Sequence, residues 1–205
     1  MGRPTYLWRQ LTAKQRADLL GWRRRNDLPW HSPPHHASDR TRFHITAACY
    51  EHQAYIGHSH ERMHEFSSTL LDGLRQCGAS VYAWCVLPNH YHVLIESATV
   101  LDVLRGLGRI HGRLSFQWNG QEGTRGRQVW CGAVERYMRN DAHFWATMNY
   151  VHHNPVRHGY VERWQDWPFS SALEYLQRVG PQQAARIWQT YPLLDYGEGW
   201  DDPEL

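Results

Sequence analysis

Lysine is almost absent from this chain of 205 residues, because Lys14 is the only lysine among 22 basic residues. The others are arginines, whose planar guanidinium group suits phosphate oxygens and base edges. A GC-rich genome would produce the same bias without any functional cause. The distribution adds information, since residues 1–25 hold six arginines and Lys14 against a single acid, Asp18. A basic leading segment of this kind favours a polyanionic partner.

The chain also lacks an apolar run of the roughly 18 residues that a membrane span requires. Its first residues contain no apolar signal core, so we expect a cytoplasmic protein with no membrane partner. Four scattered cysteines form no Cys-x-x-Cys pair, which favours buried thiols in a reducing compartment. A hydrophobic fraction of 41% is typical of a folded protein.

Strand and helix patterns along the chain predict an α+β fold. Strands are expected over 42–50, 81–86, 90–95 and 129–134, with a hairpin turn at Pro88-Asn89. Helices are expected over 11–25, 59–77, 100–118, 171–178 and 182–190. A further helix should be capped by Asp141 and end at Asn154, because a residue before proline avoids the helical region. The arrangement predicts an antiparallel β-sheet packed by helices, a ferredoxin- or RRM-like palm with an N-terminal helix and a C-terminal helical extension.

Two histidines at positions i and i+2 form the first candidate site. In the run Leu87-Pro-Asn-His-Tyr-His92 they fall on a predicted strand, where residues two apart face the same side. His90 and His92 could therefore grip one divalent ion and leave the rest of its coordination sphere open, as catalysis requires. A surface pair or hydrogen-bonded core histidines would show the same spacing.

The predicted helix after Asp141 carries a tyrosine and an amide on one face, which groups His143, Thr147, Tyr150 and Asn154. A separate apolar stripe consists of Phe144, Met148 and Val151. Tyr150 is therefore expected to lie beside the packing face and not to be buried within it. Asn154 could add its carbonyl oxygen to the ion held by the histidine pair. A core or rim tyrosine remains the alternative for Tyr150.

Several separated motifs together resemble one known family. The runs 87–95 (Leu-Pro-Asn-His-Tyr-His-Val-Leu-Ile) and 150–159 (Tyr-Val-His-His-Asn-Pro-Val-Arg-His-Gly), with Trp167-Pro-Phe-Ser-Ser171 and Trp30-His-Ser-Pro-Pro-His35, resemble the REP-associated tyrosine transposases. These are single-tyrosine enzymes of the histidine–hydrophobe–histidine nuclease superfamily. The resemblance covers about residues 28–175. Tyr91 departs from the family pattern, which often has an aliphatic residue between the histidines.

The resemblance implies an activity and its residues. His90, His92 and Asn154 would hold Mg²⁺ or Mn²⁺, and Tyr150 would be the nucleophile. Such enzymes cut and rejoin single-stranded DNA at hairpins formed by repetitive extragenic palindromes, through a 5′-phosphotyrosine intermediate. The chain would then divide into a basic helix and proline-rich loop (1–36), a catalytic nuclease domain (37–175), and a C-terminal helix with an acidic tail (176–205).

The expected partner is single-stranded or hairpin DNA, bound by a monomer in preference to a homodimer. Trp30 and Trp118 are candidates for base stacking, since single-stranded bases stack well on aromatic faces. Phosphate contacts are expected among the arginines Arg23, Arg24, Arg25, Arg125, Arg127, Arg136, Arg139 and Arg157.

Two other functions compete with this interpretation. A non-catalytic DNA-hairpin-binding protein derived from a transposase would keep the binding surface and lose the chemistry. A zinc-dependent hydrolase could instead use His58, His60 and His64, because His60 and His64 share a helix face at spacing i, i+4. No glutamate completes a His-Glu-x-x-His motif there, which excludes a zincin.

Overall fold

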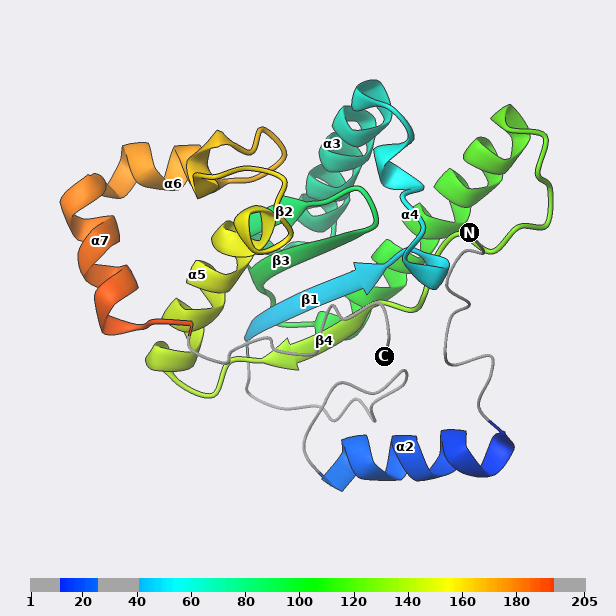
Figure 1. The fold of residues 1–205 in the computed structure, drawn as a ribbon, viewed down its shortest axis with the longest axis horizontal. Helices are drawn as coiled ribbons and strands as arrows, with labels where there is room; N and C mark the ends of the chain where they lie inside the picture. Colours follow the sequence, from blue (N-terminus) through cyan, green and yellow to red (C-terminus); the bar gives the residue numbers. More distant parts are fainter. Residues whose placement is uncertain (1–11, 26–40, 194–205) are drawn as a thin grey trace.

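A four-stranded antiparallel sheet forms the centre of the computed structural model, which describes residues 12–25 and 41–193 (Figure 1). The strands are β1 (Arg42–Ala48), β2 (Ser80–Val86), β3 (His90–Glu96) and β4 (Val134–Tyr137), in the order β2-β3-β1-β4. The helices are α2 (Ala13–Arg25), α3 (His60–Gln76), α4 (Val100–Gln121), α5 (Asp141–Arg157), α6 (Ala172–Val179) and α7 (Pro181–Thr190). The succession β1-α3-β2-β3-α4-β4 with this strand order confirms the ferredoxin-like palm.

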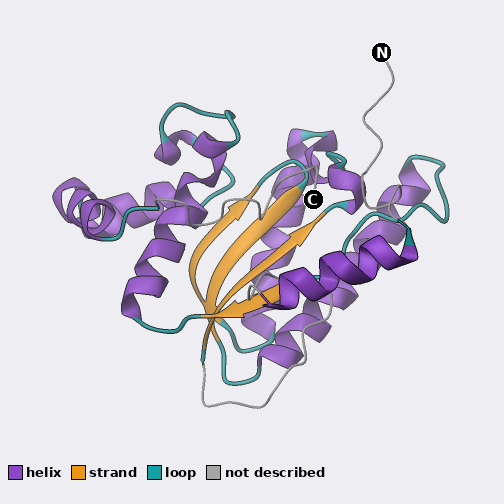
Figure 2. Ribbon diagram, turned by 60° about the horizontal axis from the view of Figure 1, so that its bottom comes forward, coloured by secondary structure: helices purple, strands orange, loops and turns teal. Residues whose placement is uncertain are grey.

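The two faces of the sheet bury different helices, as the ribbon in Figure 2 shows from a second angle. Residues that alternate along β1 and β3, such as Ile45 and Val93, pack with α3 and α4 in one core. The opposite face, which includes Leu94, packs with α5, α6 and α7 in a second core. Because side chains alternate along a strand, His90 and His92 lie on the α5 face with Leu94.

Most predicted elements agree with the structure, and the predicted strand over 129–134 is wrong. Within that stretch the structure has an isolated bridge between Cys49 and Trp130, and the strand starts only at Val134. The side chains of Val129 and Trp130 are buried in the α3–α4 core, although these residues belong to a loop. Burial of a loop thus produced the pattern that suggested a strand.

Helix α5 differs from its prediction at both ends. Its N-cap is Asn140, whose side chain accepts a hydrogen bond from the backbone N–H of His143, so Asp141 is the first helical residue. The helix passes through Pro155 and ends at Arg157. Gly159, with φ of 71°, closes it. The N–H of Tyr160 donates to the carbonyl of Pro155, and that of Gly159 to Val156, which is a Schellman motif.

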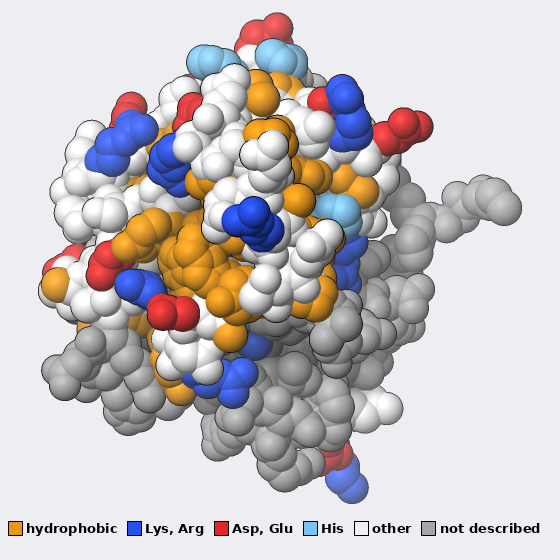
Figure 3. Space-filling view, turned by 90° about the vertical axis from the view of Figure 1, so that its left-hand side faces the viewer, with side chains coloured by type: hydrophobic (Ala, Val, Ile, Leu, Met, Phe, Trp, Pro, Cys, Tyr) orange, Lys and Arg blue, Asp and Glu red, His pale blue; other side chains and the backbone are white. Residues whose placement is uncertain are grey.

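The C-terminal part of the described chain is anchored to the sheet and to α5. The backbone of Ser171 donates to the carbonyl of Trp84 at the edge strand β2, and the Ser171 hydroxyl accepts from the Trp84 N–H. The predicted domain boundary at residue 175 falls inside α6. Figure 3 shows a hydrophobic patch with charged side chains around it on this side of the molecule; Leu173 of α6 and Trp188 of α7 are among the exposed apolar residues.

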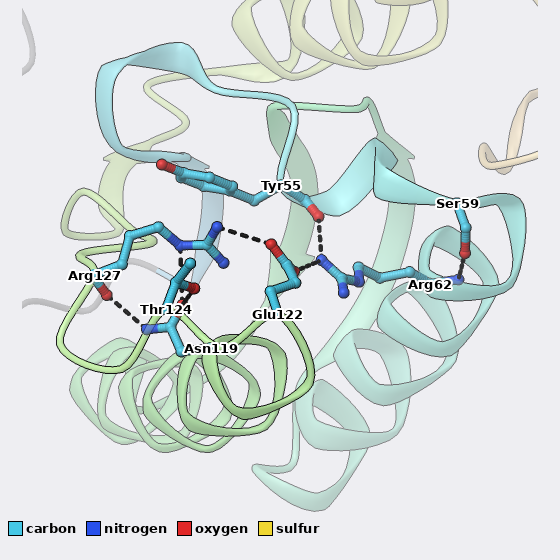
Figure 4. A network of polar contacts seen from close by, with 7 residues as sticks. All are labelled: Tyr55, Ser59, Arg62, Asn119, Glu122, Thr124 and Arg127. Atoms are coloured by element: carbon cyan, nitrogen blue, oxygen red, sulfur yellow. Dashed lines mark hydrogen bonds and ion pairs between the residues drawn. The ribbon is translucent and has the colours of Figure 1, made fainter.

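An ionic network fixes the loop after α4 against the start of α3 (Figure 4). The carboxylate of Glu122 accepts from Arg62 at 2.6 Å and from Arg127 at 2.8 Å. The hydrogen bond from Arg127 is the largest cause, and together with the contact from Arg62 it lowers the pKa of Glu122 to about 2. Arg127 also donates to Asn119 and lies over the ring of Tyr55. Arg127, predicted to contact phosphate, is therefore engaged in holding this loop.

The four cysteines are free thiols, and Cys49 and Cys85 are buried. Burial raises the pKa of the Cys49 thiol to about 12. Within the described ranges, no helix combines the length and apolar character that crossing a bilayer would require.

Candidate metal centre and nucleophile

His90 and His92 lie side by side on the α5 face of β3, as the strand pattern predicts. Their ring centroids are 5.0 Å apart and their planes are nearly perpendicular. Both side chains are buried, with exposed fractions of 2% and 0%. The pair is therefore held rigidly by packing, in a site from which bulk water is largely excluded.

The turn before β3 and helix α5 hold the ring of His90 from two sides. Its Nδ1 lies 2.8 Å from Oδ1 of Asn89, and its Nε2 lies 3.1 Å from Oδ1 of Asn154. A carbonyl oxygen only accepts, so the contact with Asn89 places a proton on Nδ1 of His90. If the ring is neutral with its proton on Nδ1, the lone pair of Nε2 is directed at Oδ1 of Asn154. A cation bound there could then be coordinated by both atoms.

His92 makes a contact that the sequence motifs do not reveal. Its Nδ1 lies 3.1 Å from Nε2 of His44, a histidine of β1 that is 2% exposed. The register pairs Thr46 with His92, so His44 is a diagonal neighbour across the two strands. The alternation of Phe43, His44 and Ile45 would have placed His44 on the same face as the pair, which is the signal that could have found it.

Tyr150 of α5 lies directly against these histidines. Its ring is edge-on to that of His92, with centroids 5.1 Å apart, and 5.9 Å from that of His44. The guanidinium carbon of the exposed Arg157 lies 5.9 Å from the centroid of Tyr150. A phenol, two imidazoles and an amide thus come together between one strand and one helix.

The prediction that Tyr150 lies outside the packing face is wrong. Tyr150 is 1% exposed and shares the second core with Met148 and Val151. The reason is that α5 lies across the sheet, so the face carrying Tyr150 and the apolar stripe beside it both meet side chains of the strands. Asn154 is fully buried on the same face.

The residues present fit a divalent ion such as Mg²⁺ or Mn²⁺. Two imidazole nitrogens and one amide oxygen are suitable donors, and all three are neutral. Among the described residues, no group of three or more histidine, cysteine, aspartate or glutamate side chains is arranged to hold a metal ion. The candidate centre therefore depends on Asn154 as its third member.

The rival zinc cluster is not assembled in the structure. His58, His60 and His64 are all exposed at or near the start of α3, and they do not form a metal-binding group. The ring of His60 instead packs on Phe169 at 5.0 Å. Ser59 caps α3 by accepting from the N–H of Arg62, so this segment is a solvated helix start.

The remaining predicted DNA contacts fall into four groups. Arg139 and Arg157 are exposed at the two ends of α5, and Arg136 lies on β4 beside His44. Arg125 is exposed but stacks on Phe116 and donates to its carbonyl. Trp118 is 1% exposed in the core, so its prediction as a base-stacking residue is wrong. The side chains of Arg23, Arg24 and Arg25, and all of Trp30, lie outside the described residues.

Tyr91, which departs from the family pattern, points to the other face of the sheet. Its hydroxyl lies 3.2 Å from Nε2 of His111, whose ring stacks on Trp130. Burial raises the pKa of Tyr91 and lowers that of His111 to about 4. Tyr91 is therefore a core residue, separated from the histidine pair by the sheet itself.

Fold and site together define a ferredoxin-like domain with a paired-histidine centre facing a helix-borne tyrosine. No family model matches the chain. A protein of Haemophilus influenzae, named as a candidate REP-associated tyrosine transposase, is 27% identical over 123 residues, which are 53% of this chain and 68% of that protein. The REP-associated tyrosine transposase of Escherichia coli K12 is 29% identical over 92 residues, 44% of this chain and 53% of the relative.

A solved structure supports the fold. A REP-associated tyrosine transposase bound to a REP hairpin superposes with a TM-score of 0.57 at 19% identity, over 72% of this chain and 86% of that one. At this identity the likeness establishes the architecture alone. With the two relatives, it confirms that the chain is similar to the REP-associated tyrosine transposases, as its motifs predict. The match spans about half the length of the second relative.

Proposed function

We propose that this protein is a metal-dependent transposase that cleaves and rejoins single-stranded DNA at REP-like hairpins, with Tyr150 as the nucleophile. The observation that carries the proposal is the convergence of Tyr150 on His92 and of Asn154 on His90. These four residues come from two elements and face one side of the sheet. The names of the relatives, and the REP hairpin bound to the solved neighbour, support hairpin DNA as the substrate.

In the proposed reaction, the phenol oxygen of Tyr150 attacks the phosphorus of a phosphodiester. A bond forms between this oxygen and phosphorus, the bond from phosphorus to the 3′-oxygen breaks, and the leaving oxygen takes up a proton to become a free 3′-hydroxyl. The phenol proton passes to a base. The product is a 5′-phosphotyrosine, which conserves the phosphodiester energy, so a second 3′-hydroxyl can reverse the step and join strands without ATP.

His90, His92 and Asn154 would hold Mg²⁺ or Mn²⁺. When bound, the ion supplies Lewis-acid stabilisation of the phosphodiester oxygens. Because the three side chains are neutral, they leave the full charge of the ion available to the substrate. The buried positions of the histidines strengthen such electrostatic effects, since screening by water is weak there. The exposed Arg157, beside the ring of Tyr150, is suited to attract the DNA phosphate.

We also propose that one chain is sufficient for the site. Tyr150 and the histidine pair meet within the same chain, so no second subunit is needed to bring the phenol to the ligands. This favours a monomer. A non-catalytic hairpin-binding protein is the alternative, and it shares the expected DNA affinity without the covalent step.

The test is a covalent-adduct assay with the full chain. Hairpin oligonucleotides with single-stranded flanks, copied from inverted repeats beside the gene, are incubated with Mn²⁺ and run on a denaturing gel. We expect a slowly migrating protein–DNA adduct that disappears with EDTA and in Tyr150→Phe. Tyr91→Phe is the matched control, because it removes a buried tyrosine hydroxyl from the opposite face and should retain the adduct.

Two outcomes would overturn the proposal. An adduct that persists in Tyr150→Phe would assign the nucleophile to another residue. Tight hairpin binding by the wild-type protein, without an adduct under Mg²⁺ or Mn²⁺, would favour the non-catalytic alternative.

A further inference from the structure

We infer that His44 is a positioning residue that fixes the ring of His92 in the state that can bind a metal ion. The inference rests on the metal site of the proposed function and adds a residue to it. His44 lies on β1, outside the motif that contains the ligands. Its Nε2 is 3.1 Å from Nδ1 of His92, and both side chains are buried.

The hydrogen bond between the two rings requires one proton, which has two placements. If Nε2 of His44 carries it, Nδ1 of His92 is the acceptor, and the neutral ring of His92 has its own proton on Nε2. If Nδ1 of His92 carries it, Nε2 of His92 keeps a lone pair for a cation. Only the second placement makes His92 a ligand, and His44 must then be the acceptor, with its proton on Nδ1.

The same reasoning applies to His90, so both histidines would bind the ion through Nε2. Asn89 accepts from Nδ1 of His90 through a carbonyl oxygen, so Nε2 is the ligand atom there as well. His92 has a second imidazole in the role that Asn89 plays for His90. Such outer contacts orient the ligand ring and commonly contribute about 10- to 100-fold to metal affinity.

The structure also restrains His44 on both sides. Its strand register places it beside Leu94 of β3 and Arg136 of β4, and its ring meets that of Tyr150 at 5.9 Å. One residue therefore contacts the ring of a ligand and the ring of the proposed nucleophile. We therefore expect replacement of His44 to weaken metal binding while the protein still folds.

The test measures Mn²⁺ binding to the DNA-free protein by electron paramagnetic resonance. We expect His44→Ala to weaken the affinity by about 10- to 100-fold. His44→Gln, whose amide oxygen can accept from Nδ1 of His92, should restore part of the loss. His60→Gln, an exposed histidine at the start of α3, is the control and should bind as the wild type does. Thermal unfolding of each variant separates misfolding from loss of a ligand contact.

A second readout is the protonation state of His92 without metal. Nitrogen-15 NMR of the imidazole should show the proton on Nδ1 in the wild type and a mixture of both tautomers in His44→Ala. Equal Mn²⁺ affinities for the wild type and a folded His44→Ala would overturn the inference. If the wild type itself binds no Mn²⁺, the proposed metal site fails instead, so the two failures are distinguishable.

An independent observation concerns Tyr160, for which we propose a role in stacking an unpaired base of the DNA beside the site. Its backbone is fixed by the Schellman motif that ends α5, the helix of Tyr150 and Asn154. Its ring is 42% exposed, and burial of the remainder raises the pKa of its hydroxyl. A rigidly placed, half-exposed ring is a suitable platform for a base.

Ring contacts connect Tyr160 to the candidate ligands. The ring of His158 lies 4.9 Å from that of His90 and 6.4 Å from that of Tyr160. The ring of Tyr160 also lies 5.3 Å from that of Trp167, in a tilted arrangement. The occupant we assign is an unpaired nucleobase next to the scissile phosphate, because that base follows the phosphate out of the buried site. The role therefore rests on the proposed function.

The test combines a protein variant with an altered substrate. We expect Tyr160→Leu to weaken binding of a hairpin with a single-stranded flank by about 5- to 150-fold, the range of one base–aromatic stack, whereas Tyr160→Phe keeps it. Trp188→Leu is the control, since Trp188 is an exposed aromatic residue of α7 that is not among the expected DNA contacts.

The substrate arm replaces each flanking base in turn by an abasic site. One position should weaken wild-type binding and have no further effect on Tyr160→Leu. If every abasic site affects the two proteins equally, Tyr160 does not stack on a base. Adduct formation by Tyr160→Leu at saturating DNA would show that the proposed function itself stands.

Discussion

The ring of Tyr150 meets the ring of His92 edge to face, with centroids 5.1 Å apart. One ring belongs to helix α5 and the other to strand β3, and the two contact each other within a single chain. The T-shaped geometry is a favourable one for aromatic pairs. In the proposed reaction, this contact would bring the tyrosine hydroxyl and the metal ion to the same phosphodiester.

Asn154 should affect both the affinity of the site for the metal ion and the positive charge that the bound ion presents to the substrate. Asn154→Ala removes the oxygen 3.1 Å from Nε2 of His90, and we expect Mn²⁺ affinity to fall at least tenfold. Asn154→Asp should bind Mn²⁺ more tightly yet form the adduct more slowly, because a carboxylate neutralises part of the charge. Calorimetry and single-turnover assays check the two effects. An unchanged affinity in Asn154→Ala would remove this residue from the site.

Gly57 should be required for the position of the turn that precedes His90. A Cβ at Gly57 would lie 2.9 Å from Cα of Pro88, and the N–H of Gly57 donates to the carbonyl of Pro88. Because the obstacle is backbone, Gly57→Ala must displace the turn that carries Asn89. We expect a loss of about 1–3 kcal/mol in the free energy of unfolding and weaker Mn²⁺ binding.

Gly108 is the matched control for that substitution. It lies within α4 with open space where a Cβ would stand. Gly108→Ala should therefore stabilise the protein by about 0.5–1 kcal/mol in urea unfolding. If Gly57→Ala and Gly108→Ala have the same stability, the close approach of Gly57 to Pro88 does not limit the stability of the protein.

Glu122 should contribute to stability through the network that holds the loop after α4. Glu122→Gln removes the carboxylate that both guanidinium groups contact. The side chain of Arg62 is only 8% exposed, so its charge would remain buried without this partner. We expect the free energy of unfolding to fall by about 1–3 kcal/mol. Asp102→Asn breaks an exposed ion pair with Arg105 and should change stability by less than about 0.5 kcal/mol. Equal effects would contradict a structural role for the network.

His111 should make the fold sensitive to acid. Burial lowers the pKa of its imidazole from 6.5 to about 4, so between these values the unfolded chain binds the proton that the folded protein excludes. Stability must therefore decrease as the pH falls from about 6.5 to about 4, by up to about 1.4 kcal/mol per pH unit from this group. Urea unfolding at pH 7, 6 and 5 measures the slope.

The His111→Gln variant supplies the comparison for that experiment. An amide can accept from the hydroxyl of Tyr91 and does not titrate in this range, so the variant should show a smaller slope. Identical slopes in the two proteins would assign the acid sensitivity to other groups.

Much of the fold and half of the site could be predicted from local patterns. Alternation along residues 90–95 placed His90 and His92 on one face, because the two-residue period of a strand is a local property. The helix predicted over 59–77 is followed by Gly78, which adopts a φ of 73°, a conformation that favours glycine after a helix end. The turn at Pro88-Asn89 likewise needs only its own residues.

The errors share one physical cause, which is packing between segments far apart in the sequence. Trp118 was expected to stack on DNA bases and is enclosed between α3 and the loop at Trp130. Helix α5 was expected to stop before Pro155, yet it continues to Arg157. Its contacts with the sheet compensate for the backbone hydrogen bond that proline cannot donate. Tyr150 was expected beside the core and is buried in it, because α5 covers the sheet with two adjacent faces.

The amino-acid sequence by itself determined three of the four strands, most helix ends, the paired histidines and the presence of a tyrosine and an amide one turn apart. Only the tertiary structure decided that these groups meet, and that His44 joins them. Strand alternation and helical period act over a few residues, whereas a diagonal contact across β1 and β3, or a phenol set against an imidazole, depends on strand register and on where α5 crosses the sheet. Those choices belong to the core as a whole, since register and helix position are set by all the side chains that must be buried together.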